Sequence, residues 1–551
     1  MTRPTIPSAS SRVLSRAFSL FPRIEGLFMS RLKQFAWLAC GVAAVVLSQA
    51  SVRAQEAAPA EAGQLMRPQA ALTAQAEGVR LLGEKKYKEA LTQFNLAIAA
   101  DNTFPEAWLG KADAQMAQED YQSAAGSYTQ AIDRDPNLAA AFNGRGECML
   151  ELQMLDAAST DFNYALEKSP SDPKILSNIG HILVNYSRDA ASATTAIRRL
   201  DDAIAGNPED ARAYRDRGYA HALLREFDKG EADLKKAAEI DPADHENFAV
   251  LANVYLFQDD YARAGDALSK AIAAYKPEKG TDPEIFVAGY TLRADACLKL
   301  AEKEKDAAKA EAYLKSVIAD ADTIISKFEG RFPEEGRAYF RKGRAQRMLK
   351  QYSDAVNSFT RAVSDIPPGQ EAEYIADALM YRGICWYYMG EPDLARGDFE
   401  QASSTGSGYQ DPRIFLWIGF THHQQGNHRD AINSYGEALA KNPGYAIAHV
   451  NKGRAYMDLK EYERARECFN DAVRSEPDVG ENYYNVGFAY LQEKKYQKAA
   501  DFFRLALLKD NPQPKMFSKM AEACRELGKN DLAEEYQRKA DEANGKQAAS
   551  N

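Results

Sequence analysis

Small side chains recur along the chain at a fixed interval, and this recurrence predicts the architecture. The first members of the series follow one another at steps of 34 residues: Gly78, Ala112, Gly146 and Gly180. Later members are Gly343, Gly383, Gly419, Gly453, Gly487 and Ala521, with last steps of 36, 34, 34 and 34 residues. Most members are followed after twelve positions by a second small residue, four positions later by a bulky residue, and three positions after that by an alanine.

Each period predicts a pair of packed helices. Spacings of four, three and seven residues place side chains on one face of a helix. Small side chains there let two helices approach closely, and the bulky residue fills the space between them. Many periods end in proline, which lacks the N–H that a continuing helix needs. These prolines are Pro136, Pro170, Pro208, Pro242, Pro367, Pro443 and Pro477. Such regular interruptions exclude an unbroken heptad coiled coil.

This order of residues at a period of 34 resembles the tetratricopeptide repeat. The resemblance covers residues 71–547 and gives thirteen repeats, ten clear and three divergent. The clear repeats start near Ala71, Pro105, Ala139, Ala211, His245, Gly336, Ala376, Pro412, Ala446 and Gly480. The divergent ones are 173–210, with a four-residue insertion around Ser187 to Ser192, the stretch 287–332, and 514–547. The resemblance implies an all-α fold: a right-handed α-solenoid of stacked antiparallel helix pairs, whose concave face binds partner proteins or peptides.

The period divides the chain into two predicted arrays. Residues 71–278 hold repeats 1 to 6, and residues 336–547 hold repeats 8 to 13. Over 279–335 the period is lost, and both a lengthened, divergent helix pair and a joint between the arrays stay open as interpretations. Residues 548–551 form a short tail.

The chain departs from the family pattern just before the first small residue of many repeats. Leucine is usual there, but several repeats have a basic residue instead: Lys111, Arg145, Arg217, Lys342, Arg382 and Lys452. A long aliphatic stem covers apolar surface while its charge reaches water, and we interpret these residues in that way.

The N-terminal region predicts export. Residues 1–54 form a leader in which Arg31 and Lys33 precede an uncharged apolar stretch over 35–47, and a small-x-small cleavage site ends at Ala54. This is the layout of a secretory signal peptide, and the apolar stretch is short for a bilayer span. Met29, just before the basic residues, is an alternative start. Residues 55–70 are typical of a flexible linker. An uncleaved membrane anchor is the alternative.

Composition and charge fit a folded protein that does not bind nucleic acid. Hydrophobic residues make up 45% and charged residues 27% of the chain, which argues against bulk disorder. The net charge is −10, and without the basic leader the rest has 62 basic and 78 acidic residues, a net charge of −16. Phosphate binding needs clustered Lys and Arg, so we expect no nucleic-acid partner. The six cysteines form no CxxC pair, and we expect buried, unpaired thiols.

Partner-binding residues are predicted on the first helix of each repeat, which lines the concave face of such solenoids. In two repeats this face is basic, through Arg212 and Arg215 in one and Arg337, Arg344 and Arg347 in the other. Such clusters suit an acidic segment or a C-terminal carboxylate. The alternative is a charged surface whose basic side chains are offset by nearby Asp and Glu.

Further along the chain the same positions turn apolar. They form a nearly continuous stripe, interrupted by Arg454, of Met380, Ile384, Leu416, Phe420, Val450, Tyr484 and Phe488. Exposed apolar surface of this extent usually marks an interaction site, so we predict a groove for an extended or helical peptide. Burial of the stripe by a tight superhelical curl is the alternative.

No motif indicates catalysis. The chain lacks GxxxxGK[ST], GxSxG and HExxH, and the repeats leave no room for a separate enzyme domain. His422, His423 and His428 are close in sequence, but adjacent helical residues point about 100° apart, and we interpret the three as surface and turn histidines. We therefore predict no enzyme, no metal site and no cofactor.

Two functional interpretations follow. The first is a non-catalytic scaffold or adaptor, exported to the periplasm or another extracytoplasmic space. The second is an accessory subunit of a cell-envelope enzyme or assembly complex, tethered to the membrane by an uncleaved leader. A mature protein that begins at Gln55 in the soluble fraction favours the first.

Overall fold

The computed structural model describes residues 67–187, 189–275, 283–327, 334–365, 372–405, 411–509 and 512–550. The predicted leader over 1–54 lies outside these residues, as does the predicted linker up to residue 66. The described residues are helical and include no strand. None of their helices is both long enough and apolar enough to cross a membrane.

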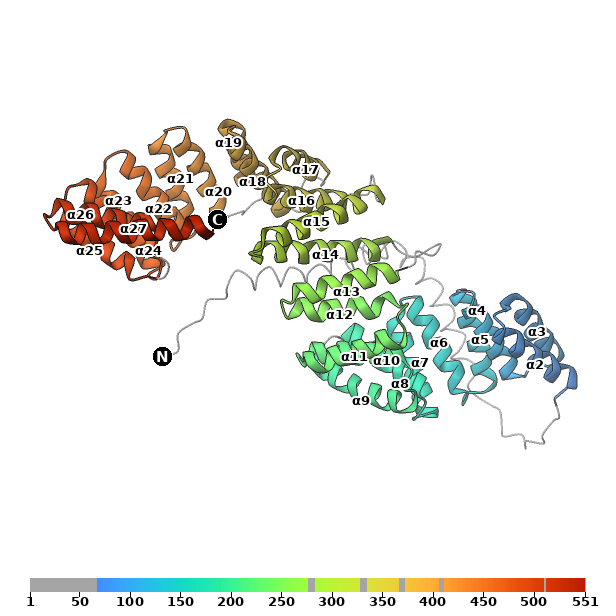
Figure 1. Ribbon diagram of the computed structural model, residues 1–551. Helices are drawn as coiled ribbons and strands as arrows, with labels where there is room; N and C mark the ends of the chain where they lie inside the picture. Colours follow the sequence, from blue (N-terminus) through green and yellow to red (C-terminus); the bar gives the residue numbers. More distant parts are fainter. Residues whose placement is uncertain are drawn as a thin grey trace. The chain divides into compact units, whose positions relative to one another are not determined.

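The chain forms two compact units, divided after Tyr275 (Figure 1). The described residues of unit 1 form six helix pairs. Their first helices are α2 (Gln69–Gly83), α4 (Pro105–Met116), α6 (Ala139–Glu151), α8 (Pro173–Ile182), α10 (Ala211–Leu223) and α12 (His245–Phe257). Their second helices are α3 (Tyr87–Ala100), α5 (Tyr121–Arg134), α7 (Leu155–Lys168), α9 (Ala190–Gly206), α11 (Phe227–Ile240) and α13 (Tyr261–Ala274).

The described residues of unit 2 form seven more pairs. Its first helices are α14 (Pro283–Lys303), α16 (Glu334–Met348), α18 (Ala372–Met389), α20 (Pro412–Gln424), α22 (Ala446–Asp458), α24 (Gly480–Gln492) and α26 (Pro514–Glu526). Its second helices are α15 (Ala307–Lys327), α17 (Tyr352–Asp365), α19 (Pro392–Ser404), α21 (His428–Lys441), α23 (Tyr462–Ser475), α25 (Tyr496–Leu507) and α27 (Asn530–Ser550). The predicted all-α fold of stacked antiparallel helix pairs is confirmed, with thirteen pairs among the described residues of the two units.

The two helices of a pair meet where a glycine faces an aromatic ring. A Cβ atom built on Gly383 would lie 2.6 Å from a ring carbon of Phe399, and one built on Gly453 would lie 2.5 Å from Phe469. Both rings are buried, with at most 1% of their surface exposed. Glycine and ring are sixteen residues apart in each case, so the predicted roles of the small and bulky positions are confirmed.

Three of the six basic residues before the small position, all of them arginines, do not extend into water as predicted. Arg382 on α18 donates two hydrogen bonds to the carboxylate of Asp398 on α19, at 2.8 and 2.6 Å. Arg145 with Asp161 and Arg217 with Asp233 form the same fork, again sixteen residues apart. The carboxylates are largely buried. In these repeats a largely buried ion pair joins the two helices beside the contact between the glycine and a bulky residue, which is Phe162, Leu234 or Phe399.

The interrupted repeats keep the fork, or a contact between the glycine and a bulky residue, at longer spacings, and in the repeat that starts at 173 this contact joins Gly180 and Leu200. Arg293 on α14 binds Asp320 on α15, with Nε and Oδ2 2.9 Å apart, although 27 residues separate them. The eleven extra residues correspond to about three helical turns, so both side chains keep their faces on a lengthened helix pair. In the repeat that starts at 173, a π-helical segment, Leu183–Ser187, leads into the insertion.

The first helices lie on the inner side of the stack in each unit. Successive first helices contact one another. Examples are α2 with α4 and α8 with α10 in unit 1, and α24 with both α22 and α26 in unit 2. Successive second helices make few such contacts among the described residues. A stack in which one row of helices is closer together curves toward that row. We call the inward surface the first-helix face.

Candidate functional site

The predicted apolar stripe is not a continuous exposed surface. Met380, Ile384, Leu416 and Val450 are 1%, 4%, 5% and 9% exposed and belong to the cores between helices. For these four the expectation of an exposed groove lining is wrong. The physical reason is the close approach of neighbouring repeats, which covers the side chains.

The stripe stays partly open at its aromatic members. Phe420 is half-buried between the rings of Trp417 and Tyr435, at centroid distances of 5.2 and 5.9 Å. Tyr484 and Phe488 on α24 are also half-buried and stack on each other, with centroids 6.1 Å apart. Burial is the main reason that the pKa of Tyr484 is raised, so its phenol is neutral over the ordinary pH range.

Three cations surround the Tyr484–Phe488 pair. Lys515 and Lys519 on α26 hold their ammonium groups 5.2 Å from the Tyr484 ring centre and 5.8 Å from that of Phe488. On α22, the other neighbour of α24, Arg454 is 49% exposed. We call Arg454, Tyr484, Phe488, Lys515 and Lys519 the C-terminal patch.

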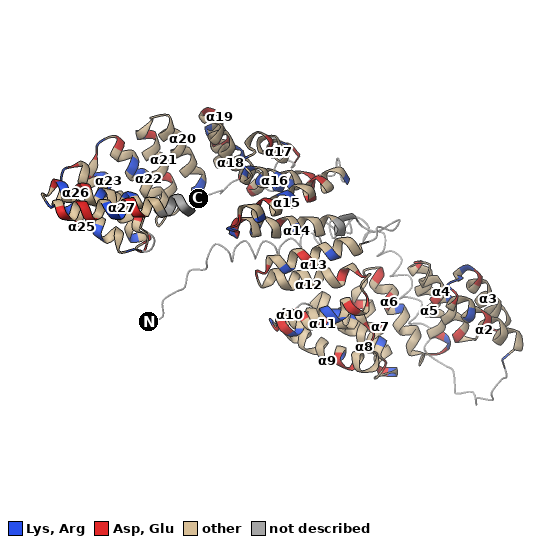
Figure 2. Cartoon of the chain, viewed as in Figure 1, with Lys and Arg blue, Asp and Glu red and all other residues tan. Residues whose placement is uncertain are grey.

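The cations of the C-terminal patch share few carboxylates. Glu481 accepts from Lys515 Nζ at 2.7 Å and lies 3.7 Å from Arg454, and Lys519 pairs with Glu522 at 2.7 Å. Two acidic groups therefore serve three basic ones. Elsewhere, Lys and Arg are interspersed with Asp and Glu along the helices of both units (Figure 2).

The predicted basic face of unit 1 is largely neutralised within the chain. Arg215 is buried and pairs with Asp244 and Glu246. Arg212 is more exposed, donates to Asn178 Oδ1 at 3.1 Å, and lies 3.8 Å from Asp216. These contacts favour the offset charged surface over a free binding cluster.

In the second predicted basic face, Arg344 is paired with a carboxylate and Arg347 with an aromatic ring. Arg344 donates to Glu302 Oε1 at 2.8 Å, and Arg347 lies over the ring of Tyr381 at 4.9 Å from its centre. Arg337 is half-buried, and its carbonyl accepts a hydrogen bond from Arg341. Which of these residues contact a partner stays a prediction.

Sequence reasoning missed a ladder of polar contacts between the first helices of unit 1. Asn178 on α8 donates to Asn143 Oδ1 at 3.0 Å and to Glu147 Oε1 at 2.8 Å, both on α6. Asn178 in turn accepts from Arg212 on α10, so three successive first helices are joined. Asn178 is 1% exposed, so the ladder's main role is to hold neighbouring repeats together. Polar residues 34 or 35 positions apart are its only sequence signal.

Family models of the tetratricopeptide repeat match the chain in both units. One matches residues 76–138, 109–173 and 185–245, a second 422–486, and a third 480–508 and 514–547. The chain belongs to the tetratricopeptide-repeat family. Proteins of this family are typically non-catalytic scaffolds that bind other proteins or peptides.

Several solved structures are similar to parts of the chain at low sequence identity. YrrB, described as a TPR protein with an unusual peptide-binding site, is 22% identical and matches 33% of this chain and 91% of its own, with a TM-score of 0.28. The Cut9–Hcn1 hetero-tetramer of APC/C is 15% identical and matches 86% of this chain and 93% of its own, with a TM-score of 0.32. A tetratricopeptide repeat protein from Parabacteroides merdae ATCC 43184 is 15% identical and matches 57% of this chain and 99% of its own, with a TM-score of 0.32. No curated protein matches the chain.

Proposed function

We propose that this protein is a scaffold that binds an extended segment of a partner protein on the first-helix face of unit 2, at the C-terminal patch. The observation that carries the proposal is the half-buried Tyr484–Phe488 stack flanked by Lys515, Lys519 and Arg454 on adjacent first helices. Exposed aromatic and arginine side chains are the residues that dominate protein interfaces.

The patch favours a particular kind of segment. An apolar side chain of the partner packs on the Tyr484–Phe488 stack, and a carboxylate of the partner binds Arg454 and Lys515. Within the chain these two cations share one carboxylate, that of Glu481. The ionic part is exposed to solvent, so the affinity falls as the salt concentration rises.

Selection of peptides on the purified full chain tests the proposal. We expect that peptides enriched from a random displayed library combine an aromatic or aliphatic residue with Asp or Glu. We also expect that the double variant Arg454→Glu/Lys515→Glu binds the best of them at least about tenfold more weakly, a loss of about 1.4 kcal/mol.

The matched control is Arg474→Glu. Arg474 lies on the second helix α23 with 74% of its side chain exposed, so its reversal makes the same kind of charge change away from the first-helix face. Equal affinity of wild type and the double variant would reject the proposal, as would an equal loss in the control.

We further propose that the protein acts outside the cytoplasm. The basic, apolar and small-residue order of residues 29–54 supports this. N-terminal sequencing of the protein from its source cells tests it. A mature protein that starts at Gln55 in a soluble fraction agrees with an exported scaffold, and one that keeps residues 29–54 in membranes indicates the tethered accessory subunit.

A further inference from the structure

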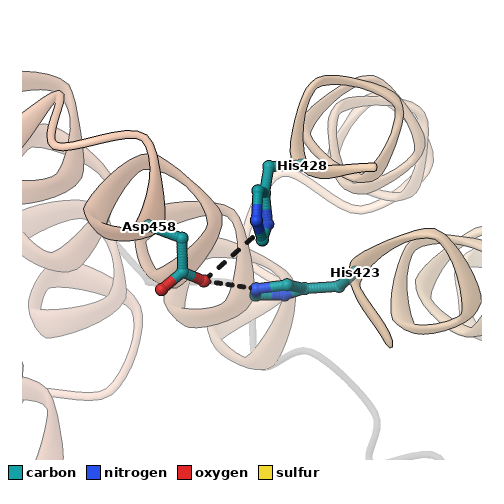
Figure 3. Close-up of side chains that lie close together, drawn as sticks. All are labelled: His423, His428 and Asp458. Carbon is teal, nitrogen blue, oxygen red and sulfur yellow. Dashed lines mark hydrogen bonds and ion pairs between the residues drawn. The ribbon is translucent and has the colours of Figure 1, made fainter. Parts of the chain in front are cut away.

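Two histidines and an aspartate from neighbouring repeats converge in unit 2 (Figure 3). His423 lies in the last turn of α20, His428 is the first residue of α21, and Asp458 is the last residue of α22. Nε2 of His423 is 2.6 Å from Oδ2 of Asp458, and Nδ1 of His428 is 3.8 Å from the same oxygen. One nitrogen or oxygen of each residue lies within 4.8 Å of the others.

A tight turn brings the two histidines together. Gly426, between α20 and α21, has a φ of +77°, a conformation that glycine adopts without strain. Its N–H donates to the carbonyl of His423 at 3.0 Å, and the N–H of Asn427 donates to that of His422 at 2.9 Å. The imidazole rings of His423 and His428 are therefore held 5.2 Å apart, edge to face.

One ligand atom of the cluster is left unused. Nδ1 of His428 is buried from solvent and has no hydrogen-bond partner within the described part of the chain. A buried polar atom without a partner costs stability. A positive ion between His428 and Asp458 would satisfy it.

A related contact in unit 1 shows what the cluster looks like without a second imidazole. His181 on α8 binds Asp216 on α10 at 2.9 Å, and these residues are 35 positions apart, as are His423 and Asp458. There the third member is Asn185, whose side-chain amide donates to Asp216 Oδ1 and lies 3.0 Å from Nδ1 of His181, so that this nitrogen has a partner in either tautomer. That cluster is complete as a hydrogen-bonded set, whereas the His428 cluster is not.

We propose that His423, His428 and Asp458 bind a divalent cation of the zinc class, which fastens one repeat to the next. Two imidazole nitrogens and one carboxylate oxygen suit Zn²⁺, and a water molecule completes the usual four ligands. Ca²⁺ and Mg²⁺ prefer sites built from oxygen. Binding through Nε2 of His423 uses the neutral imidazole with its proton on Nδ1.

The geometry needs only small adjustments to hold this ion. Bonds of about 2.0 to 2.2 Å put tetrahedral ligand atoms roughly 3.3 Å apart. The atoms here are between 2.6 and 4.8 Å apart, and the side chains of His428 and Asp458 are 28% and 49% exposed, so both can rotate.

Calorimetric titration of Zn²⁺ into the full chain, without a histidine tag and after removal of metals with a chelator, tests the proposal. We expect one saturable site. His428→Gln and Asp458→Asn should each weaken the affinity at least tenfold, whereas His181→Gln, which alters the matched cluster of unit 1, should leave it unchanged. Circular dichroism establishes that each variant is folded.

Co²⁺ supplies a second readout that reports the ligands directly. The wild-type chain should give the visible absorption of tetrahedral Co²⁺, and His428→Gln should lose it. A wild-type chain that takes up no stoichiometric Zn²⁺, or a folded His428→Gln chain that binds it as tightly as wild type, would overturn the proposal.

Discussion

At the scale of single residues, the glycine that faces a buried ring is the position that fixes how closely two helices pack. Gly383 and Gly397 lie in the same helix pair but in opposite surroundings. A Cβ on Gly383 would overlap the buried ring of Phe399, whereas one on Gly397 meets nothing within 4 Å.

These two glycines give opposite predictions for the same substitution. Gly383→Ala should destabilise the protein by about 1 to 3 kcal/mol, because the ring must move in a filled core. Gly397→Ala should stabilise it by about 0.5 to 1 kcal/mol through helix propensity. Urea unfolding measures both, and a Gly383→Ala protein at least as stable as Gly397→Ala would contradict the packing described here.

The cysteines give a second prediction at this scale. Five are buried and unpaired, and burial raises the pKa of Cys148 and Cys385 to about 12 and that of Cys468 to about 11. Alkylation needs the thiolate, so iodoacetamide at pH 8 should leave all five unmodified in the folded chain.

Intact-mass measurement on a Cys40→Ser chain provides the test, because Cys40 lies outside the described residues. The same chain in concentrated urea should gain five modifications. Labelling of the folded chain at the rate of the unfolded one would show that the thiols are accessible.

At the scale of helices, the forks between Arg and Asp are the contacts that sequence reasoning misjudged. The length of its side chain predicts that a basic residue beside the small position reaches water with its charge. In the structure Arg382 instead binds an aspartate on the other helix of the pair. The recurrence of Arg and Asp sixteen residues apart was a signal that could have shown it. The cluster of His423 and Asp458 was missed for the same reason, because its partners are 35 residues apart.

A double-mutant cycle on one fork tests its contribution. Arg382→Leu should cost about 3 to 5 kcal/mol, because it leaves the buried carboxylate of Asp398 without its cation. Arg382→Leu/Asp398→Ala should be more stable than Arg382→Leu alone, because no charge is left buried. Urea unfolding of the wild type, of Arg382→Leu, of Asp398→Ala and of the double variant gives the coupling energy. A loss of unfolding free energy in the double variant that equals or exceeds the sum of the losses in the two single variants would contradict the fork.

The contact between α8 and α10 should depend on pH. Burial alone would raise the pKa of Asp216, but the charges of His181, Arg212 and Arg215 outweigh it, and the pKa lies below its ordinary value of 3.8. A carboxyl group whose pKa is lowered by folding stabilises the fold at pH values above its pKa in the unfolded chain. This stabilisation is lost progressively as the pH falls below 3.8.

Asp216→Asn should therefore lower the thermal midpoint at pH 7, and its difference from wild type should shrink as the pH is lowered below 3.8. Asp228→Asn, at an exposed position of α11, is the control for the change in net charge. A difference that is constant with pH would show that the charge of Asp216 contributes nothing.

At the scale of the molecule, the period predicted the fold well. Seven of the ten clear repeat starts, at Pro105, Ala139, Ala211, His245, Pro412, Ala446 and Gly480, are the first residues of helices. Local spacing decides where a helix begins, and proline or a small residue marks it.

The candidate site was harder to predict, because exposure depends on how neighbouring repeats pack. Met380 and Ile384 occupy the same repeat positions as Tyr484 and Phe488, yet the first two are buried and the last two are half-buried. Equivalent positions in a repeat therefore do not imply equal access to a partner.

The central claim is that a partner segment binds on first helices of unit 2, and photo-crosslinking tests it most directly. A peptide selected on the full chain, with a photoreactive group in place of its apolar residue, is irradiated in the complex and its attachment sites are located by mass spectrometry. The account predicts attachment to α22, α24 and α26. Attachment to the second helices α23, α25 and α27, or to unit 1, would contradict it.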